Sequence, residues 1–169
     1  MEGANGAGKT SLLRLIAGFL APAAGRLLVG TDGGESDDPD ERGRLVGWLG
    51  HLDGLKPQVT VLEQLAFYAR LHGVGDADLT STLAEVGLGS ARAELPCRYL
   101  SAGQRRRLAL ARLMVSRRPL WLLDEPFAAL DAAGQSLMAQ VMARHCGQGG
   151  IVIAATHDPL DLGNESLKL

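Results

Sequence analysis

Three segments of the chain are dominated by unbroken runs of apolar residues. They are residues 45–49, residues 120–125 and residues 151–156. Strands that are buried on both faces of a parallel sheet have this pattern, whereas strands with one solvated face alternate between apolar and polar positions. We therefore predict three buried strands, the second of which ends in the acidic pair Asp124 and Glu125.

Between and before these runs, apolar residues recur every three or four positions, which is typical of helices that bury one face. The segments with this spacing are residues 10–20, 60–73, 76–86, 105–118 and 131–145. Thr60 and Glu63 are spaced as a capping box, in which each side chain satisfies a backbone N–H group of the other residue. Helices that alternate with buried strands predict an α/β fold with a mainly parallel sheet and flanking helices.

Two segments near the N-terminus are less apolar. Residues 25–29 predict a short strand, and residues 31–43 predict a solvated loop because Gly, Pro and acidic residues are frequent there. The acidic residues of this segment lack the ligand spacing of an EF-hand, so they do not predict a calcium site. Residues 55–98 read as helical throughout and stand between the two halves of the chain that contain strands.

Composition excludes several functional classes. The 169 residues carry a net charge of −2, which gives no general reason to expect nucleic acid or an anionic membrane as a partner. No apolar run approaches the roughly 20 residues of a membrane-spanning helix, and the first residues do not resemble a signal peptide. Cys97 and Cys146 have no metal-ligand spacing, and we interpret them as ordinary side chains in a reducing compartment.

The clearest chemical motif lies at residues 3–10, which match the pattern Gly-x-x-x-x-Gly-Lys-Thr. Its glycines let the backbone wrap closely around an anion, and the positive end of the following helix also favours phosphate. In this pattern Lys9 reaches the outer phosphates of a nucleotide, and the Thr10 hydroxyl binds Mg²⁺. The predicted nucleotide-binding residues are Gly3, Ala4, Asn5, Gly6, Ala7, Gly8, Lys9, Thr10 and Ser11. A glycine-rich turn before a helix is the alternative, since chance gives such a match in roughly one chain per hundred.

A phosphate loop normally follows the carboxyl end of a buried strand, but only Met1 and Glu2 precede this one. We therefore expect the native chain to begin further upstream, with N-terminal strands that are missing from these 169 residues. We also expect the 169-residue chain by itself to bind ATP poorly.

Asp124 and Glu125 follow an apolar strand, as in a Walker B motif. Asp124 is expected to hold Mg²⁺ opposite Thr10, so Thr10 and Asp124 are the predicted metal ligands. Glu125 is expected to be catalytic, because a carboxylate beside the outer phosphate can orient or deprotonate the attacking water. A strand that simply ends in two solvated acids is the alternative.

Residues 100–104 distinguish between families of phosphate-loop proteins. The motif consists of Leu100, Ser101, Ala102, Gly103 and Gln104. Ser101 is a good helix N-cap, and Gly103 allows an anion to approach the start of the helix. The chain resembles the ATP-binding cassette (ABC) family, whose signature has Gly at the place of Ala102. Further matching elements are a D-loop formed by Ala129, Leu130 and Asp131, and a switch histidine, His157.

This resemblance implies a P-loop NTPase fold with a single domain over residues 1–169. Residues 1–51 and 110–169 would form its RecA-like core, and residues 52–109 a helical and signature subdomain. The resemblance also implies ATP and Mg²⁺ as cofactors and a head-to-tail dimer with a second copy of the chain. Ser101 and Gly103 would contact ATP held by the partner, while His157 would contact ATP held by its own chain. Hydrolysis would then separate the subunits and drive integral membrane partners.

The basic run of Arg105, Arg106 and Arg107 could indicate a nucleic-acid surface. On a helix, however, neighbouring residues point in different directions. We interpret the run as a solvated helix face and predict no nucleic-acid partner.

His51 occupies the position where the ABC family has the glutamine of its Q-loop. A neutral imidazole offers one donor and one acceptor, but it suits Mg²⁺ poorly because that ion prefers oxygen ligands. Whether this position contacts metal and water therefore stays open, and a simple loop residue is the alternative.

The segments around His51, Gly103 and His157 also resemble one subfamily, the ATP-binding subunits of the haem exporters of cytochrome c maturation. This resemblance implies a peripheral ATPase at the cytoplasmic face of the inner membrane, whose helical segment contacts membrane subunits. The alternatives are the ATPase subunit of another small-substrate exporter, a soluble ABC ATPase of DNA repair or translation, and a catalytically inactive binding module. The motifs leave open whether haem itself or a haem chaperone is moved.

Overall fold

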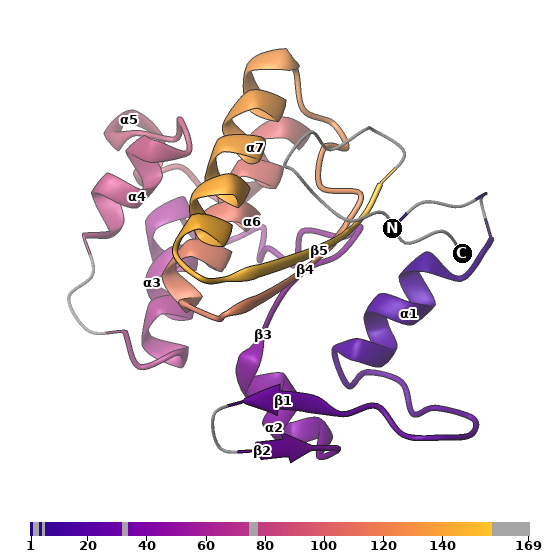
Figure 1. Ribbon diagram of the computed structural model, residues 1–169. Coiled ribbons are helices and arrows are strands. Elements are labelled where there is room, and N and C mark those ends of the chain that lie inside the picture. Colours follow the sequence, from indigo (N-terminus) through magenta and orange to yellow (C-terminus); the bar gives the residue numbers. More distant parts are fainter. Residues whose placement is uncertain (2–3, 5, 32–33, 75–77, 157–169) are drawn as a thin grey trace.

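Among the residues that the structure describes, three parallel strands form the sheet on which the other elements pack (Figure 1). The strands are β3 (Val46–Leu49), β4 (Leu120–Asp124) and β5 (Ile151–Ala155), in the order β3-β4-β5. In the register of this sheet, Trp48 lies opposite Leu122, and Leu122 lies opposite Ile153. The prediction of parallel strands at these three places is confirmed.

The structure is a computed structural model that describes residues 1, 4, 6–31, 34–74 and 78–156. Its helices are α1 (Lys9–Ile16), α2 (Pro39–Leu45), α3 (Val61–Leu71), α4 (Leu79–Glu85), α5 (Ser90–Ala93), the 3₁₀ helix η1 (Cys97–Tyr99), α6 (Ala102–Ser116) and α7 (Ala132–Gly147). A short antiparallel hairpin of β1 (Val29–Thr31) and β2 (Gly34–Ser36) is separate from the main sheet. No helix in the described part of the chain is long and apolar enough to cross a membrane.

Neighbouring residues of β4 pack on opposite faces of the sheet. Trp121 and Leu123 belong to the larger core, on the side where α6 and α7 lie (Figure 1). Leu122 faces the other way and forms a smaller core with Leu13 of α1 and Ala155 of β5. Burial on both faces is the reason why β4 is apolar throughout.

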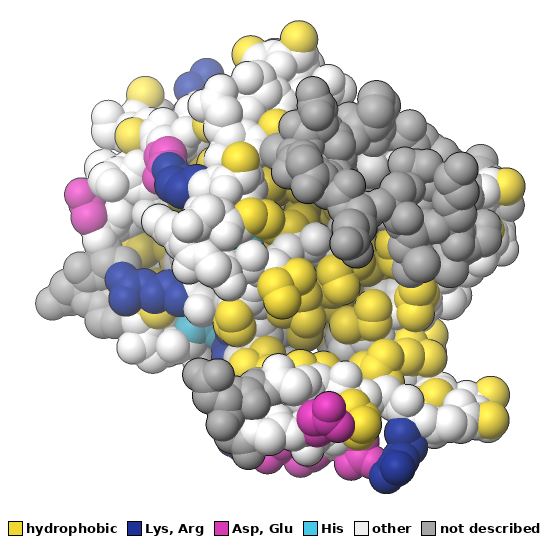
Figure 2. Space-filling model, viewed as in Figure 1, with side chains coloured by type: hydrophobic (Ala, Val, Ile, Leu, Met, Phe, Trp, Pro, Cys, Tyr) yellow, Lys and Arg dark blue, Asp and Glu magenta, His cyan; other side chains and the backbone are white. Residues whose placement is uncertain are grey.

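The face of the sheet toward α1 is only partly covered by described residues. Leu122 is fully buried there, whereas Ile151, at the amino end of β5, keeps 60% of its surface exposed. Figure 2 shows hydrophobic side chains gathered on this face above the β1–β2 hairpin. The amino group of Met1 donates to the carbonyl of Ala154 at 2.6 Å, which places Met1 beside β5.

The helical segment between β3 and β4 is anchored in the larger core. The predicted capping box of α3 is present: the Thr60 hydroxyl accepts from the N–H group of Glu63 at 3.1 Å, and the Glu63 carboxylate accepts from the N–H group of Thr60 at 2.8 Å. Val61 and Leu65 of α3 and Leu83 of α4 are fully buried. Both α3 and α4 pack against α6, the helix that carries the signature motif.

The interpretation of residues 31–43 as a solvated loop is wrong, because the segment contains β2 and most of α2. The carboxylate of Asp38 caps α2 by accepting from the N–H group of Asp40 at 2.9 Å, and Pro39 begins the helix. Acidic residues in the first turn also interact favourably with the helix dipole. The Asp and Pro residues that suggested a loop are therefore the residues that start a helix.

The strand predicted at residues 25–29 begins too early, since β1 starts at Val29. Arg42 of α2 is 4% exposed and donates to the carbonyl groups of Leu27 at 3.1 Å and Asp37 at 2.8 Å. The carbonyl group of Leu27 therefore accepts a hydrogen bond from this guanidinium and not from a neighbouring strand.

Replacing Leu122 with Ala should lower the free energy of unfolding by about 2–5 kcal/mol, because loss of the side chain would leave a cavity between α1 and the sheet. Leu71→Ala is the matched control: Leu71 is 62% exposed, so its truncation should change stability by less than about 0.5 kcal/mol. Urea unfolding of both variants measures the difference. Equal losses in the two variants would contradict the assignment of Leu122 to the core.

Candidate active site

The loop before α1 has the backbone conformation of an anion cradle. Gly6 and Gly8 have φ angles of +83° and +97°, a region that residues with a Cβ atom rarely adopt. A Cβ atom added at either glycine would meet nothing within 4 Å, so the backbone angle and not crowding is what requires glycine here. Gly3 and Asn5 lie outside the described residues.

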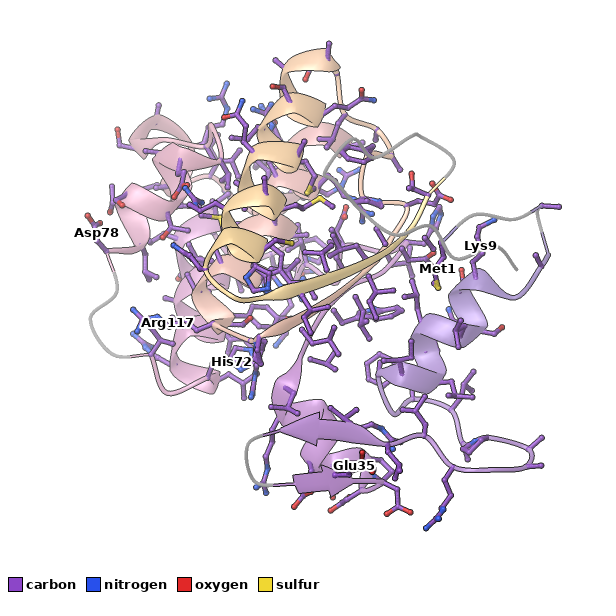
Figure 3. All side chains as sticks on the ribbon, viewed as in Figure 1. Met1, Lys9, Glu35, His72, Asp78 and Arg117 are labelled. Atoms are coloured by element: carbon purple, nitrogen blue, oxygen red, sulfur yellow. The ribbon has the colours of Figure 1, made fainter. Side chains whose placement is uncertain are left out.

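Lys9 and the first turn of α1 complete this cradle. The Lys9 side chain is 9% exposed, and its Nζ donates to the carbonyl of Ala4 at 3.2 Å, across the loop. Figure 3 shows Lys9 at the amino end of α1, near Met1, and Glu35 on the separate hairpin. The unpaired N–H groups and the positive dipole end of a helix start favour an anion at this place.

Thr10 and Asp124 meet although they are 114 residues apart in the chain. The Thr10 hydroxyl lies 3.0 Å from one carboxylate oxygen of Asp124 and 3.1 Å from the other. A hydroxyl and a carboxylate are hard oxygen ligands of the kind that Mg²⁺ prefers. Within the described residues, no group of three or more His, Cys, Asp or Glu side chains could hold a metal ion alone. An ion here therefore needs additional oxygen ligands, as phosphate or water supplies.

Glu125 follows β4 in an unusual backbone conformation. Its φ angle is +49°, in the left-handed region, which costs on the order of 1–3 kcal/mol for a residue other than Gly. Its N–H group donates to the carbonyl of Ala155 at 2.8 Å, so β5 holds one side of this peptide. Such strain is concentrated at functional positions, where it fixes the direction of a side chain.

One cavity of about 370 Å³ brings most of the predicted catalytic and nucleotide-binding residues together. It is lined by Gly6, Ala7, Gly8, Lys9, Thr10, Ser11, Arg14, His51, Asp124 and Glu125. The exposed side chain of His51 comes from the loop that follows β3. The position aligned with the Q-loop is therefore adjacent to the phosphate loop, as the resemblance implies, whereas His157 lies outside the described residues.

The signature residues lie elsewhere on the chain. Ser101 caps α6: its hydroxyl accepts from the N–H group of Gln104 at 3.2 Å, and Gln104 Oε1 accepts from the N–H group of Ser101 at 2.9 Å. Neither Ser101 nor Gly103 lines the cavity at the phosphate loop. Ala102 instead lines a neighbouring cavity of about 550 Å³, between the His51 loop and Ala129.

Gly103 has a packing role that the sequence did not reveal. A Cβ atom at this position would lie 2.9 Å from the carbonyl oxygen of Ala129, so only Gly permits this contact between α6 and the D-loop. The D-loop is itself fixed, because the Asp131 carboxylate caps α7 by accepting from the N–H group of Gly134 at 2.8 Å. The signature helix and the D-loop are therefore packed as one unit.

The interpretation of the arginine run as a solvated face is wrong for Arg106, which is 3% exposed. Its guanidinium donates to four backbone carbonyls and one carboxylate around the end of β4. The signal was present in the sequence: Arg106 shares a helical stripe with Ala109, Leu110 and Leu113, which are all buried. The run of three like charges masked that stripe.

Burial lowers the pKa of the Arg106 guanidinium, while its hydrogen bond to Asp53 and the charge of that carboxylate raise it. The nearby charges of Asp124 and Glu125 also raise this pKa. Arginine stays protonated in proteins, so a fixed positive charge lies behind the two acidic residues of the site.

Comparison with known proteins decides the family. The family described as ABC transporter matches residues 1–128. The chain belongs to the ABC transporter family. Its phosphate loop, Asp124 and signature motif are all within the matched residues.

Curated relatives of this ABC ATPase share a printed name, "Cytochrome c biogenesis ATP-binding export protein CcmA". The protein of Rhodopseudomonas palustris (strain BisB5) is 53% identical over 169 residues, which cover 100% of this chain and 82% of the relative. The protein of Bradyrhizobium diazoefficiens is 49% identical, over 99% of this chain and 81% of the relative. These matches confirm the resemblance to the subfamily of cytochrome c maturation.

Solved structures also resemble this ABC ATPase. A dimeric bacterial ABC transporter cassette has a TM-score of 0.78 and 26% identity, over 92% of this chain and 72% of the cassette. The post-hydrolysis dimer of the same cassette, bound to ADP and Pi, has a TM-score of 0.74. The predicted P-loop NTPase fold of the ABC type is therefore confirmed.

Replacing Gly103 with Ala should destabilise the protein by about 1–3 kcal/mol, because the added methyl group meets a backbone carbonyl that cannot rotate away. Gly43→Ala is the control, since Gly43 lies in α2 with open space around it. That change should be neutral or stabilise the protein by up to about 1 kcal/mol. Denaturant unfolding measures the stability of both variants. An equally small change in Gly103→Ala would show that α6 and the D-loop are not tightly packed.

Proposed function

We propose that this chain is the ATP-hydrolysing subunit of an ABC transporter that serves cytochrome c biogenesis as a haem export complex. The observation that carries the proposal is the pairing of Thr10 with Asp124 beside the open phosphate loop, with Glu125 in the same cavity. The names of the relatives support the biological assignment.

The cavity suits Mg²⁺-ATP. The backbone N–H groups around Gly6 and Gly8 would surround the phosphates, and Lys9 would exchange its bond to Ala4 for a phosphate oxygen. Thr10 and Asp124 would hold the metal ion, directly or through water. When bound, Mg²⁺-ATP supplies the phosphoryl group and part of the charge compensation for its transfer.

Glu125 is assigned as the residue that orients or deprotonates the attacking water, because it lines the cavity next to Asp124. His51 borders the same space and offers a ring nitrogen to water or phosphate rather than to the metal. His157 is proposed to contact the outer phosphate in the same chain.

The signature residues act on the nucleotide of a second copy in this proposal. Ser101, Ala102 and the start of α6 are on the surface and outside the cavity of their own phosphate loop. A head-to-tail dimer would bring them against the partner's ATP. The dimeric state of the solved cassettes supports this arrangement.

Residues 52–109 are proposed as the helical subdomain that meets the integral membrane subunits, and residues 1–51 and 110–169 as the RecA-like core. Large apolar side chains exposed in this segment support the assignment: Leu52 (84%), Phe67 (50%), Leu71 (62%) and Tyr99 (64%). Exposed apolar groups of this kind are typical of protein contacts. The protein would then be held peripherally at the cytoplasmic face of the inner membrane.

Glu125→Gln should lower kcat for Mg²⁺-ATP hydrolysis by about 100-fold or more, because the amide cannot accept a proton from water. The Kd for ATP should stay within about threefold, since the amide keeps the size of the side chain and leaves the phosphate loop, Thr10 and Asp124 unchanged. Glu94→Gln, on an exposed residue of the helical segment, is the control and should leave both values unchanged. Normal turnover in Glu125→Gln would contradict the assignment of a catalytic role to Glu125.

Deleting the gene should abolish covalent attachment of haem to c-type cytochromes, and the wild-type gene should restore it. The Glu125→Gln gene should fail to restore it, because hydrolysis drives the export step. Haem-dependent peroxidase staining of c-type cytochromes measures the result. Unchanged haem attachment in the deletion strain would contradict the assignment to cytochrome c biogenesis, but it would not contradict the assignment as an ATPase.

A further inference from the structure

The guanidinium of Arg106 uses every N–H group that it has. Its Nε donates to the carbonyl of Pro126 at 3.2 Å. One terminal nitrogen donates to the carbonyl of Gly50 at 2.7 Å and to the carboxylate of Asp53 at 3.2 Å. The other donates to the carbonyls of Asp124 at 2.7 Å and Glu125 at 2.5 Å. Five bonds account for the five donors of an arginine side chain.

These acceptors come from two segments that are far apart in the sequence. Gly50 and Asp53 flank His51 in the loop after β3, whereas Asp124 ends β4 and Glu125 and Pro126 belong to the turn that follows it. Arg106 itself lies in the first turns of the signature helix α6. One buried cation therefore joins the loop of His51, the turn of Glu125 and the helix of the signature motif.

Arg106 also accounts for the strained backbone of Glu125. The left-handed φ angle of +49° persists only where surrounding contacts fix the peptide on both sides. The carbonyl of Ala155 accepts from the N–H group of Glu125 at 2.8 Å, and the carbonyl oxygen of Glu125 accepts from Arg106 at 2.5 Å and from the N–H group of Ala128 at 3.1 Å. Loss of the Arg106 contact would leave this carbonyl with the longer turn contact from Ala128, so the peptide would turn more easily toward the unstrained region and displace the Glu125 side chain.

We propose that Arg106 is a positioning residue for ATP hydrolysis, which fixes the direction of the Glu125 carboxylate and ties it to the loop that carries His51. This inference rests on the proposed ATPase function. The role requires a planar fork with five donors. Lysine keeps the charge but has three donors at a single point, so it cannot bond to both segments in the same way.

The first test compares Arg106→Lys with Arg107→Lys in the native protein. Arg107 is the next residue of the same helix and points toward Gly87, away from the cavity. Arg106→Lys should lower kcat by about 10- to 100-fold, because a small displacement of a catalytic group has an effect of that size. KM for ATP should stay within about threefold, and Arg107→Lys should change neither value. An unchanged kcat in Arg106→Lys would overturn the proposal.

The second test separates positioning from a general loss of structure. If Arg106 acts through the Glu125 carboxylate, Arg106→Lys should cost at most about twofold in residual turnover when Glu125→Gln is already present. The same 10- to 100-fold loss in both backgrounds would show that Arg106 supports the fold and not Glu125, and would overturn the proposal.

The third test needs no turnover, so it separates failure of this inference from failure of the proposed function. Hydrogen exchange without nucleotide should become faster at residues 50–53 and 124–128 together in Arg106→Lys, and at neither segment in Arg107→Lys. This result would support the link even if the wild-type protein hydrolysed no ATP. Unchanged exchange in either segment would overturn the link even if the wild-type protein were an active ATPase.

Discussion

The pairing of β4 between two parallel strands is the constraint on which the rest of the structure depends. Parallel alignment places the carboxyl ends of β3, β4 and β5 at the same edge, so the segments that follow them meet there. The register of β4 with its neighbours then decides which side chains lie on each face of the sheet. Leu122 packs against α1, and two residues later Asp124 meets Thr10. A shift by one residue would turn Leu122 toward the wrong core and carry Asp124 away from Thr10.

The buried charge of Arg106 is the second constraint, and it follows from the first. The chain turns at the end of β4, and Arg106 donates to the carbonyl groups of Asp124, Glu125 and Pro126 at this turn. A buried cation is tolerated only with good geometry and full hydrogen bonding, and this guanidinium has both. Its carboxylate partner, Asp53, belongs to the loop of His51, so the charge balance of the core depends on where that loop lies.

The chemical motifs could be predicted because their chemistry depends on residues close in sequence. The phosphate loop, the acidic pair after an apolar strand and the capping residue of α6 each require a short local pattern. The apolar runs at β3, β4 and β5 were equally clear, since burial on both faces leaves no polar position. The acidic segment before β3 was misread because Asp and Pro both end helices and begin them. The tertiary contacts of Arg42 with Leu27 and Asp37 are what hold this segment as the start of a helix.

The sequence by itself determined the family, the three strands of the main sheet and the motif residues proposed to bind and hydrolyse a nucleotide, because these follow from local spacing and side-chain chemistry. Tertiary structure alone decided which distant groups meet. It brought Thr10 to Asp124, aligned Gly103 with the carbonyl of Ala129, and buried Arg106 although its neighbours are partly exposed. Burial of a charge depends on acceptors from segments far along the chain, and no local pattern encodes where those acceptors will lie.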